Sequence, residues 1–349
     1  MQQVLERDRS QNGQRCRSIA GRRVGRSSQA GMRDTKPTVS HRCERSLPLV
    51  YATERLAARM ILVLPFGLRI AEDPVMARAD KILIITKANR MRHDLAEIVA
   101  SVAAKVGAAQ SRLRPADVQR KAIGDFVTAV DLRSEKRLRL DLAKLMPEAG
   151  FLGEESGSLD LGCDWLWVVD PIDGTSNFSR GLPQYAVSVA LLFRGQPVLA
   201  AIHCAPEDAL FTAVHTKGCR RNNRKITAKA GRFDDGAIIG CQWFRGQGDM
   251  GFLPRLQSSG ARIRTLGSTV VQLADAAMGR LDGNVQQQGR LWDYAAAGLV
   301  AVESGLKFTD WHGKPVFPVR DLRVEHTATI AALPTVHRKI LALLRPFAT

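Results

Sequence analysis

Helical spacing of apolar residues predicts two helices early in the patterned part of the chain. Between residues 80 and 106, apolar side chains recur every three or four positions, as on the buried face of a long amphipathic helix. Leucines recur in the same way at 131–146, where Pro147 ends the pattern because proline cannot continue a helix. Residues 121–131, which lead into this second helix, are expected to form a short loop.

Short apolar stretches rich in β-branched residues predict a sheet in the middle of the chain. WLWVVD has no polar residue before its final aspartate, as in a strand that is buried on both faces. YAVSVALLF and the next apolar run are separated by RGQP, a hairpin signal, and the basic run CRRNNRK is expected to be the solvated tip of another hairpin. The expected strands lie within 150–157, 165–170, 185–193, 198–204, 209–214 and 237–243.

Two alanine-rich segments, 268–283 and 293–305, are expected to be helices that each end at a glycine. The chain shows no repeat and no glycine-rich nucleotide-binding loop. This order of elements fits an α/β (α+β) protein with two layers of mixed or antiparallel sheet covered by helices better than a regular βαβ array. We expect three parts: a basic extension at 1–76, an N-terminal α+β subdomain at 77–234 and a C-terminal α/β subdomain at 235–349.

The charge of the chain is strongly positive, with a formal net charge of +17. Residues 1–75 hold 14 Lys and Arg against 7 Asp and Glu and show no sustained period. We expect a disordered extension there, or sequence upstream of a natural start near Met76; a targeting segment or a nucleic-acid-binding arm is the alternative. The rest of the chain has a net charge of +10, so its surface is expected to attract anions, whether phosphorylated metabolites or nucleic acid.

The cysteines and the apolar runs bear on the compartment. Six cysteines are scattered without a C-x-x-C pair, which argues against a structural zinc site and gives no disulfide framework. We therefore expect reduced thiols and a cytoplasmic location. Apolar stretches such as ILVLPFGL are far too short to cross a bilayer, so no membrane partner is expected.

A buried stretch that ends in two aspartates, WLWVVDPIDGT, is the first sign of a functional site. Asp170 and Asp173 stand at one turn, where each would raise the pKa of the other unless a cation lay between them. Pro171 is expected to end the strand, the turn to fold Asp173 back toward the same point, and Gly174 to let the backbone approach a ligand closely. Taken alone, DPIDG is also an ordinary turn sequence.

Three more acidic positions strengthen the case for a cation. GEES places Glu154 and Glu155 in a loop before the buried strand. VTAVD places Asp131 just before a helix, and LWDYAAAG places Asp293 at a helix start, where helix capping is the ordinary explanation. Mg²⁺ prefers oxygen ligands, usually a few carboxylates together with water and substrate phosphate. Each acid is ordinary by itself, but the set suits Mg²⁺.

These motifs, taken in order, resemble those of the inositol monophosphatase family of magnesium-dependent, lithium-sensitive phosphatases. VTAVD, GEES, DPIDGTSNF and WDYAAAG carry the resemblance, which runs from about Ile82 to Leu344. It implies a layered αβαβα sandwich of the inositol monophosphatase and fructose-1,6-bisphosphatase type, usually a homodimer. It also implies two or three Mg²⁺ ions and a small phosphorylated substrate.

The resemblance also implies roles for individual residues. Four carboxylates and one carbonyl oxygen match the metal ligands: Glu154, Asp170, Asp173, Asp293 and the carbonyl of Ile172. Asp131 and Thr175 match the catalytic pair that orients and deprotonates the attacking water, and Glu154 would help to hold the ion beside that water. The amides of Gly174 and Thr175 match a phosphate cradle, and Lys121 matches a basic residue on a mobile loop, although a solvated lysine explains it equally well. Substrate contacts are expected from Asp173, Gly174, Thr175, Asp293, Lys121 and Gln286.

Departures from the family pattern bear on the substrate. Where the family often has an acidic residue that receives substrate hydroxyls, NVQQQGRLWD places the neutral Gln286, and Arg290 adds positive charge near the expected ligand Asp293. The family's EAGG reads ESGL at 303–306, which we interpret as a structural change. We expect a Mg²⁺-dependent phosphomonoesterase for a small metabolite similar to inositol monophosphate. Histidinol phosphate, a 3′(2′),5′-bisphosphate nucleotide and an RNA- or transcription-complex-binding role are the alternatives.

Overall fold

The structure is a computed structural model, and it describes residues 78–110, 112, 118–122, 125–228, 231, 233–234, 236–243, 249–322 and 326–348. The basic extension expected at 1–76 lies outside these residues and stays a prediction. Within the described part of the chain, every helix is too short or too polar to span a bilayer. The cysteines at 163, 204, 219 and 241 are free, in line with the expected reduced thiols.

An eight-stranded sheet forms in the first half of the described chain. Its strands are β3 (Gly150–Gly153), β4 (Gly157–Leu159), β5 (Trp165–Asp173), β6 (Ala186–Phe193), β7 (Gln196–Cys204), β8 (Ala209–Val214), β9 (Gly218–Arg221) and β10 (Arg224–Ile226). Their order is β10-β9-β8-β7-β6-β5-β3-β4, and all neighbours are antiparallel except β3 and β5. The basic run forms the predicted hairpin β9–β10, with Asn222 and Asn223 at positive φ in its two-residue turn.

Helices cover both faces of this sheet. On one face lie α1 (Arg78–Gln110) and α2 (Ala129–Leu145), whose Leu95 and Leu138 share a core with Trp167 of β5. On the other lie α5 (Thr269–Met278) and α6 (Leu291–Ser304), whose Leu299 shares a core with Val168 of β5. Successive residues of a strand face opposite sides, so a strand covered on both sides must be apolar throughout. This is why WLWVV contains no polar residue.

A second, five-stranded sheet packs on the other side of α5 and α6. Its strands are β11 (Ile238–Gln242), β12 (Arg262–Arg264), β13 (Gly283–Gly289), β14 (Lys307–Asp310) and β15 (Thr327–Ala332), in the order β12-β11-β13-β15-β14. β11 is parallel to β12 and β13, whereas β15 is antiparallel to β13 and β14. The helices α4 (Phe252–Ser258) and α7 (Pro334–Leu344) cover its outer face.

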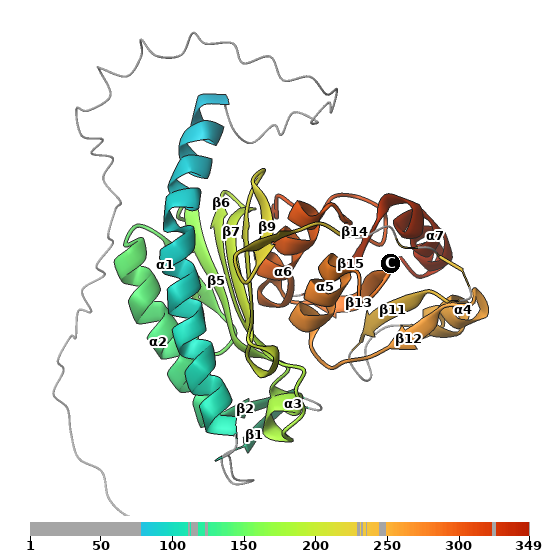
Figure 1. The fold of residues 1–349 in the computed structure, drawn as a ribbon, viewed down its shortest axis with the longest axis horizontal. Coiled ribbons are helices and arrows are strands. Elements are labelled where there is room, and N and C mark those ends of the chain that lie inside the picture. Colours follow the sequence, from blue (N-terminus) through green and yellow to red (C-terminus); the bar gives the residue numbers. More distant parts are fainter. Residues whose placement is uncertain are drawn as a thin grey trace, which may run out of the picture. The chain divides into compact units, whose positions relative to one another are not determined.

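The described elements therefore stack in five layers, helix–sheet–helix–sheet–helix, with α5 and α6 in the middle (Figure 1). This confirms the predicted αβαβα sandwich. The division into subdomains at 77–234 and 235–349 stays a prediction. The remaining helices are short: α3 (Thr175–Ser179) and the 3₁₀ turns Ala205–Glu207 and Arg345–Phe347.

The structure differs from the sequence predictions at 121–131 and at 268–283. The loop expected at 121–131 is instead the antiparallel pair β1 (Val118–Ala122) and β2 (Asp125–Thr128), followed directly by the start of α2. The helix expected at 268–283 ends at Gly279, whose φ of 71° stops it, and Gly283 opens the unpredicted strand β13. The sequence gives little sign of β13, because its centre is polar although Asn284 and Gln286 are fully buried.

Candidate active site

Three of the predicted carboxylates converge at one point. Asp170 and Asp173 lie at the end of β5, and Asp293 lies in the first turn of α6. One carboxylate oxygen from each lies within 4.8 Å of the others. Asp170 and Asp173 are buried and Asp293 is half-buried. The two segments, about 120 positions apart in the sequence, thus bring their acids to one place.

Pro171 does not end the strand as predicted. β5 continues through it to Asp173, and its register with β6 shifts between Asp170 and Asp173. In a regular strand, side chains three positions apart point to opposite faces. An irregular register, which suits the missing N–H of proline, lets both carboxylates reach the same side. The amide of Ile172 donates to Asp170 Oδ1 at 3.0 Å and fixes the local turn.

Asp173 is held by the start of α5. The Val270 amide donates to Asp173 Oδ2 at 2.8 Å, and the hydroxyl of Ser268, the N-cap of that helix, donates to the same oxygen. The sequence marked Ser268 only as a helix start. No local pattern could reveal this contact, because the two residues are 95 positions apart.

Asp293 occupies the third position of α6, and its Oδ2 accepts from the Arg290 amide at 2.8 Å. Helix capping therefore accounts for one of its two oxygens, as the sequence allowed. Its neighbour Arg290 lies over the Trp292 ring, 5.3 Å from the ring centroid.

Glu154 lies in the turn between β3 and β4 and reaches the same cluster. Its carboxyl group lies close enough to that of Asp170 to raise the pKa of Asp170. Its amide donates to the Val169 carbonyl at 3.2 Å, which ties the turn to the end of β5. The next residue, Glu155, is bound through its backbone amide to the buried side chain of Glu135, another residue that the sequence analysis did not single out.

Crowding and burial make it unfavourable for these carboxyl groups to be ionised together without a cation. Burial raises the pKa of Asp170 well above its usual value, and the charges of Glu154, Asp173 and Asp293 raise it further. Burial of the carboxyl group, followed by the charges of Asp173 and Glu154, likewise raises the pKa of Asp293. Burial raises the pKa of Asp173 to about 6, even though Ser268 and Val270 stabilise its anion. The donors are all oxygens, as a hard divalent cation requires, and a cation would offset the repulsion.

Asp131 and Thr175 meet beside this cluster. Thr175 Oγ1 lies 3.1 Å from Asp131 Oδ1 and 2.9 Å from the Ile172 carbonyl oxygen, so its single proton can be donated to either. The Thr128 amide donates to Asp131 Oδ2 at 2.8 Å, within a capping box at the start of α2. Burial raises the pKa of Asp131, which favours its acting as a proton acceptor.

Three predicted site residues remain: Gly174, Gln286 and Lys121. Gly174 precedes α3 at a φ of 90°, and a Cβ there would lie 2.6 Å from the Gln184 carbonyl oxygen, so only glycine fits. Gln286 is fully buried and its Nε2 donates to Thr269 Oγ1 at 3.0 Å. Lys121 lies in β1, not in a loop, and its side chain lies outside the described structure, so its role stays a prediction.

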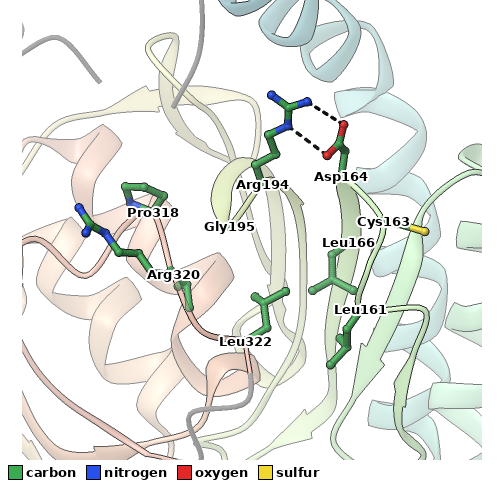
Figure 2. A pocket seen from close by; sticks show the side chains of 10 residues that line it. Leu161, Cys163, Asp164, Leu166, Arg194, Gly195, Pro318, Arg320 and Leu322 are labelled. Atoms are coloured by element: carbon green, nitrogen blue, oxygen red, sulfur yellow. Dashed lines mark hydrogen bonds and ion pairs between the residues drawn. The ribbon is translucent and has the colours of Figure 1, made fainter. Parts of the chain in front are cut away.

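A separate cavity of about 350 Å³ lies near the other end of β5 (Figure 2). It is lined by Leu161, Cys163, Asp164, Leu166, Arg194, Gly195, Pro318, Val319, Arg320 and Leu322. Two hydrogen bonds of 3.0 Å join the Arg194 guanidinium to the Asp164 carboxylate at its edge. None of the predicted site residues lines this cavity, so it is not the active site that the carboxylates indicate.

Comparisons with known proteins agree with the geometry. A family model described as "Inositol monophosphatase family" matches residues 91–346. The inositol-1-monophosphatase of Mesorhizobium japonicum is 36% identical over 234 residues, which cover 64% of this chain and 87% of that protein. The Nus factor SuhB of Escherichia coli is 32% identical over 203 residues, 56% of this chain and 76% of that protein. The crystal structure of the extragenic suppressor protein SuhB from Bartonella henselae superposes with a TM-score of 0.62 at 30% identity, covering 71% of this chain and 97% of that one.

Proposed function

The chain belongs to the inositol monophosphatase family of phosphoric monoester hydrolases, and we propose that it uses Mg²⁺ to hydrolyse a small phosphorylated metabolite similar to inositol monophosphate. The observation that carries the proposal is the convergence of Asp170, Asp173 and Asp293 within 4.8 Å, with Glu154 close enough to raise the pKa of Asp170. These four side chains and the Ile172 carbonyl would hold the ions.

The chemistry demands such a centre. Phosphate monoester hydrolysis is among the slowest uncatalysed reactions, so most of the acceleration must come from stabilising charge. When bound, Mg²⁺ would neutralise the carboxylates, draw charge from the phosphate oxygens and lower the pKa of water. The protein's own part is to place the ligands, through the register shift in β5 and the start of α5.

The Asp131–Thr175 pair would handle the proton. We infer that Thr175 Oγ1 accepts a hydrogen bond from the attacking water and donates its own proton toward Asp131 Oδ1, 3.1 Å away. The hydrogen bonds from Thr128 fix the Asp131 carboxylate so that one oxygen faces Thr175. The amides of Gly174 and Thr175, at the start of α3, would receive the phosphate.

Metal removal and a substrate panel test this proposal. Treatment with a chelator is expected to lower phosphate release by about 100-fold or more, because the ions supply several kcal/mol of stabilisation, and Mg²⁺ should restore it. The panel compares inositol phosphate, histidinol phosphate and 3′-phosphoadenosine phosphate, with and without lithium, by released phosphate. Preference for the inositol ester supports the substrate class, whereas preference for the bisphosphate would favour the more anionic alternative suggested by Gln286 and Arg290. Hydrolysis that resists the chelator would contradict the metal mechanism.

A second role, in binding RNA, rests on the 32% identity to the Nus factor SuhB and on the net charge of +17. Arg224 and Lys225 of the β9–β10 hairpin are exposed and are one candidate contact. Filter binding to an unstructured RNA should give an affinity that falls steeply with salt, since phosphate contacts release counterions. We expect residues 77–349 to keep part of this binding and Arg224→Glu with Lys225→Glu to weaken it. If residues 77–349 lose all RNA binding while the hairpin variant of the whole chain loses none, the extension alone binds the RNA.

A further inference from the structure

Glu135 is a buried carboxylate that the proposed mechanism does not use. It lies on α2 with 3% of its surface exposed. Its Oε2 accepts from the Glu155 amide and its Oε1 from the Ser156 amide, both at 2.8 Å. Within the described residues, no Lys, Arg or His forms an ion pair with it. These two backbone amides help to compensate for burying this charge.

These two amides belong to the residues that directly follow Glu154. The turn at 154–156 carries the Glu154 carboxyl group to Asp170. A carboxylate that accepts from two successive amides fixes the direction of the chain there, because both hydrogen bonds must be satisfied together. The side chain of Glu135 thus determines where Glu154 is presented.

Gly153 encloses the same carboxylate from the other side of the turn. A Cβ at Gly153 would lie 2.5 Å from Glu135 Oε2 and 2.8 Å from Oε1. Its backbone does not have the positive φ that would require glycine. The need for glycine at 153 therefore comes from space, and the space is taken by the Glu135 carboxylate.

Helix α2 also links this turn to Asp131 and Thr175, the pair proposed to orient the attacking water. Asp131 and Glu135 are four residues apart on α2, so their side chains lie on the same face of the helix, one turn apart. Asp131 meets Thr175, and Glu135 meets the turn that carries Glu154. Helix α2 therefore sets the distance between the turn that carries Glu154 and the Asp131–Thr175 pair.

We propose that Glu135 is a positioning residue that sets the affinity for the divalent cation by holding the turn 154–156 so that Glu154 reaches Asp170. This rests on the proposed function. Partners that orient metal ligands from behind typically contribute 10–100-fold to metal affinity or activity. A merely structural Glu135 would change stability without changing the affinity for Mg²⁺.

The first test compares Glu135→Ala and Glu135→Gln in the full-length chain. Mg²⁺ alone is titrated by calorimetry, and kcat and the half-saturating Mg²⁺ concentration are measured with the best substrate of the panel. Glu135→Ala is expected to weaken Mg²⁺ binding by about 10–100-fold, with kcat largely recovered at high Mg²⁺. The Mg²⁺ affinity of Glu135→Gln should lie between those of the wild type and Glu135→Ala, because the glutamine oxygen accepts from one backbone N–H while its NH₂ group faces the other. Asp141→Asn, at a half-buried position of the same helix where the carboxylate pairs with Arg137 and Lys144, is the control and should leave Mg²⁺ affinity unchanged.

The second test does not alter Glu135. Gly153→Ala should displace the Glu135 carboxylate, since the end of a flexible side chain moves more easily than backbone, and should weaken Mg²⁺ binding in the same way. In the Glu135→Ala background the added methyl enters vacated space, so Gly153→Ala should have less than about a twofold further effect, a sign of coupling between the two sites. Gly162→Ala, where an added Cβ meets nothing within 4 Å, is the control.

Unchanged Mg²⁺ affinity in both Glu135→Ala and Gly153→Ala overturns the proposal, as does a loss of kcat that high Mg²⁺ does not restore. If Glu135→Ala does not fold, Gly153→Ala and Glu135→Gln decide the matter. Asp170→Asn is measured beside them: if it keeps full activity, the metal mechanism itself fails, whereas its inactivity with unchanged Mg²⁺ binding in the Glu135 variants overturns only the role of Glu135.

Discussion

Asp170→Asn is expected to lower kcat by about 10³-fold or more while leaving the fold intact. Asp170 is in contact with Glu154 and within 4.8 Å of Asp173 and Asp293, so it is the side chain that joins the cluster. An asparagine offers one neutral oxygen in place of a carboxylate. Bound ions would contribute several kcal/mol to stabilising the transition state, and each 1.4 kcal/mol corresponds to a factor of ten in rate.

The same substitution should not destabilise the metal-free protein. Asn Oδ1 can still accept from the Ile172 amide. The change also removes a carboxyl group whose ionised form is unfavourable there, because burial and the charges of the neighbouring acids raise the pKa of Asp170. Thermal unfolding with and without Mg²⁺ checks this: the wild type should gain stability from Mg²⁺ and the variant should gain little. Asp164→Asn, which loses only the surface pair with Arg194, is the matched control and should keep its activity. Full Mg²⁺-dependent turnover in Asp170→Asn would contradict the mechanism.

The parts of the fold that the sequence predicted are those with strong local patterns. α1 follows from its helical period, and β5 and β6 follow from apolar runs that only a doubly covered strand needs. The acids of the site were identified because each stands beside a turn or helix start in a specific motif. Their meeting point was an inference from the motifs together, and the structure places three of them within 4.8 Å.

The missed features depend on contacts that are distant in the sequence. The polar strand β13 is buried because two other strands and α5 surround it, which no local pattern records. The register shift at Pro171 is visible only when β6 is in place. Ser268 donates to Asp173, and Glu135 accepts from the turn that contains Glu154, each from another segment of the chain. Their own neighbours in the sequence predict no more than a helix cap and a helix face.

Asp131→Asn separates proton transfer from metal binding. The Thr128 amide and hydroxyl both donate to Asp131 Oδ2, so the asparagine oxygen should take that position and its NH₂ group should face Thr175. The Thr175 hydroxyl then has no acceptor there and can no longer pass its proton on. We expect kcat to fall by about 10²–10⁴-fold, the usual contribution of a general base. Mg²⁺ affinity should stay within a few-fold, because Asp131 is not one of the proposed metal ligands and its Oδ2 is held by the Thr128 amide.

Substitutions of Thr175 complete this test. Thr175→Val should lose activity as Asp131→Asn does, and adding Asp131→Asn to it should cost little more, because both remove the same relay. Thr175→Ser keeps the hydroxyl and is the matched control, expected within a few-fold of the wild type. Steady-state kcat at saturating Mg²⁺ and calorimetric Mg²⁺ affinity are the two measurements. If Asp131→Asn instead weakens Mg²⁺ binding as strongly as Asp170→Asn and recovers kcat at high Mg²⁺, Asp131 is a metal ligand, and the proton must leave the attacking water by another route.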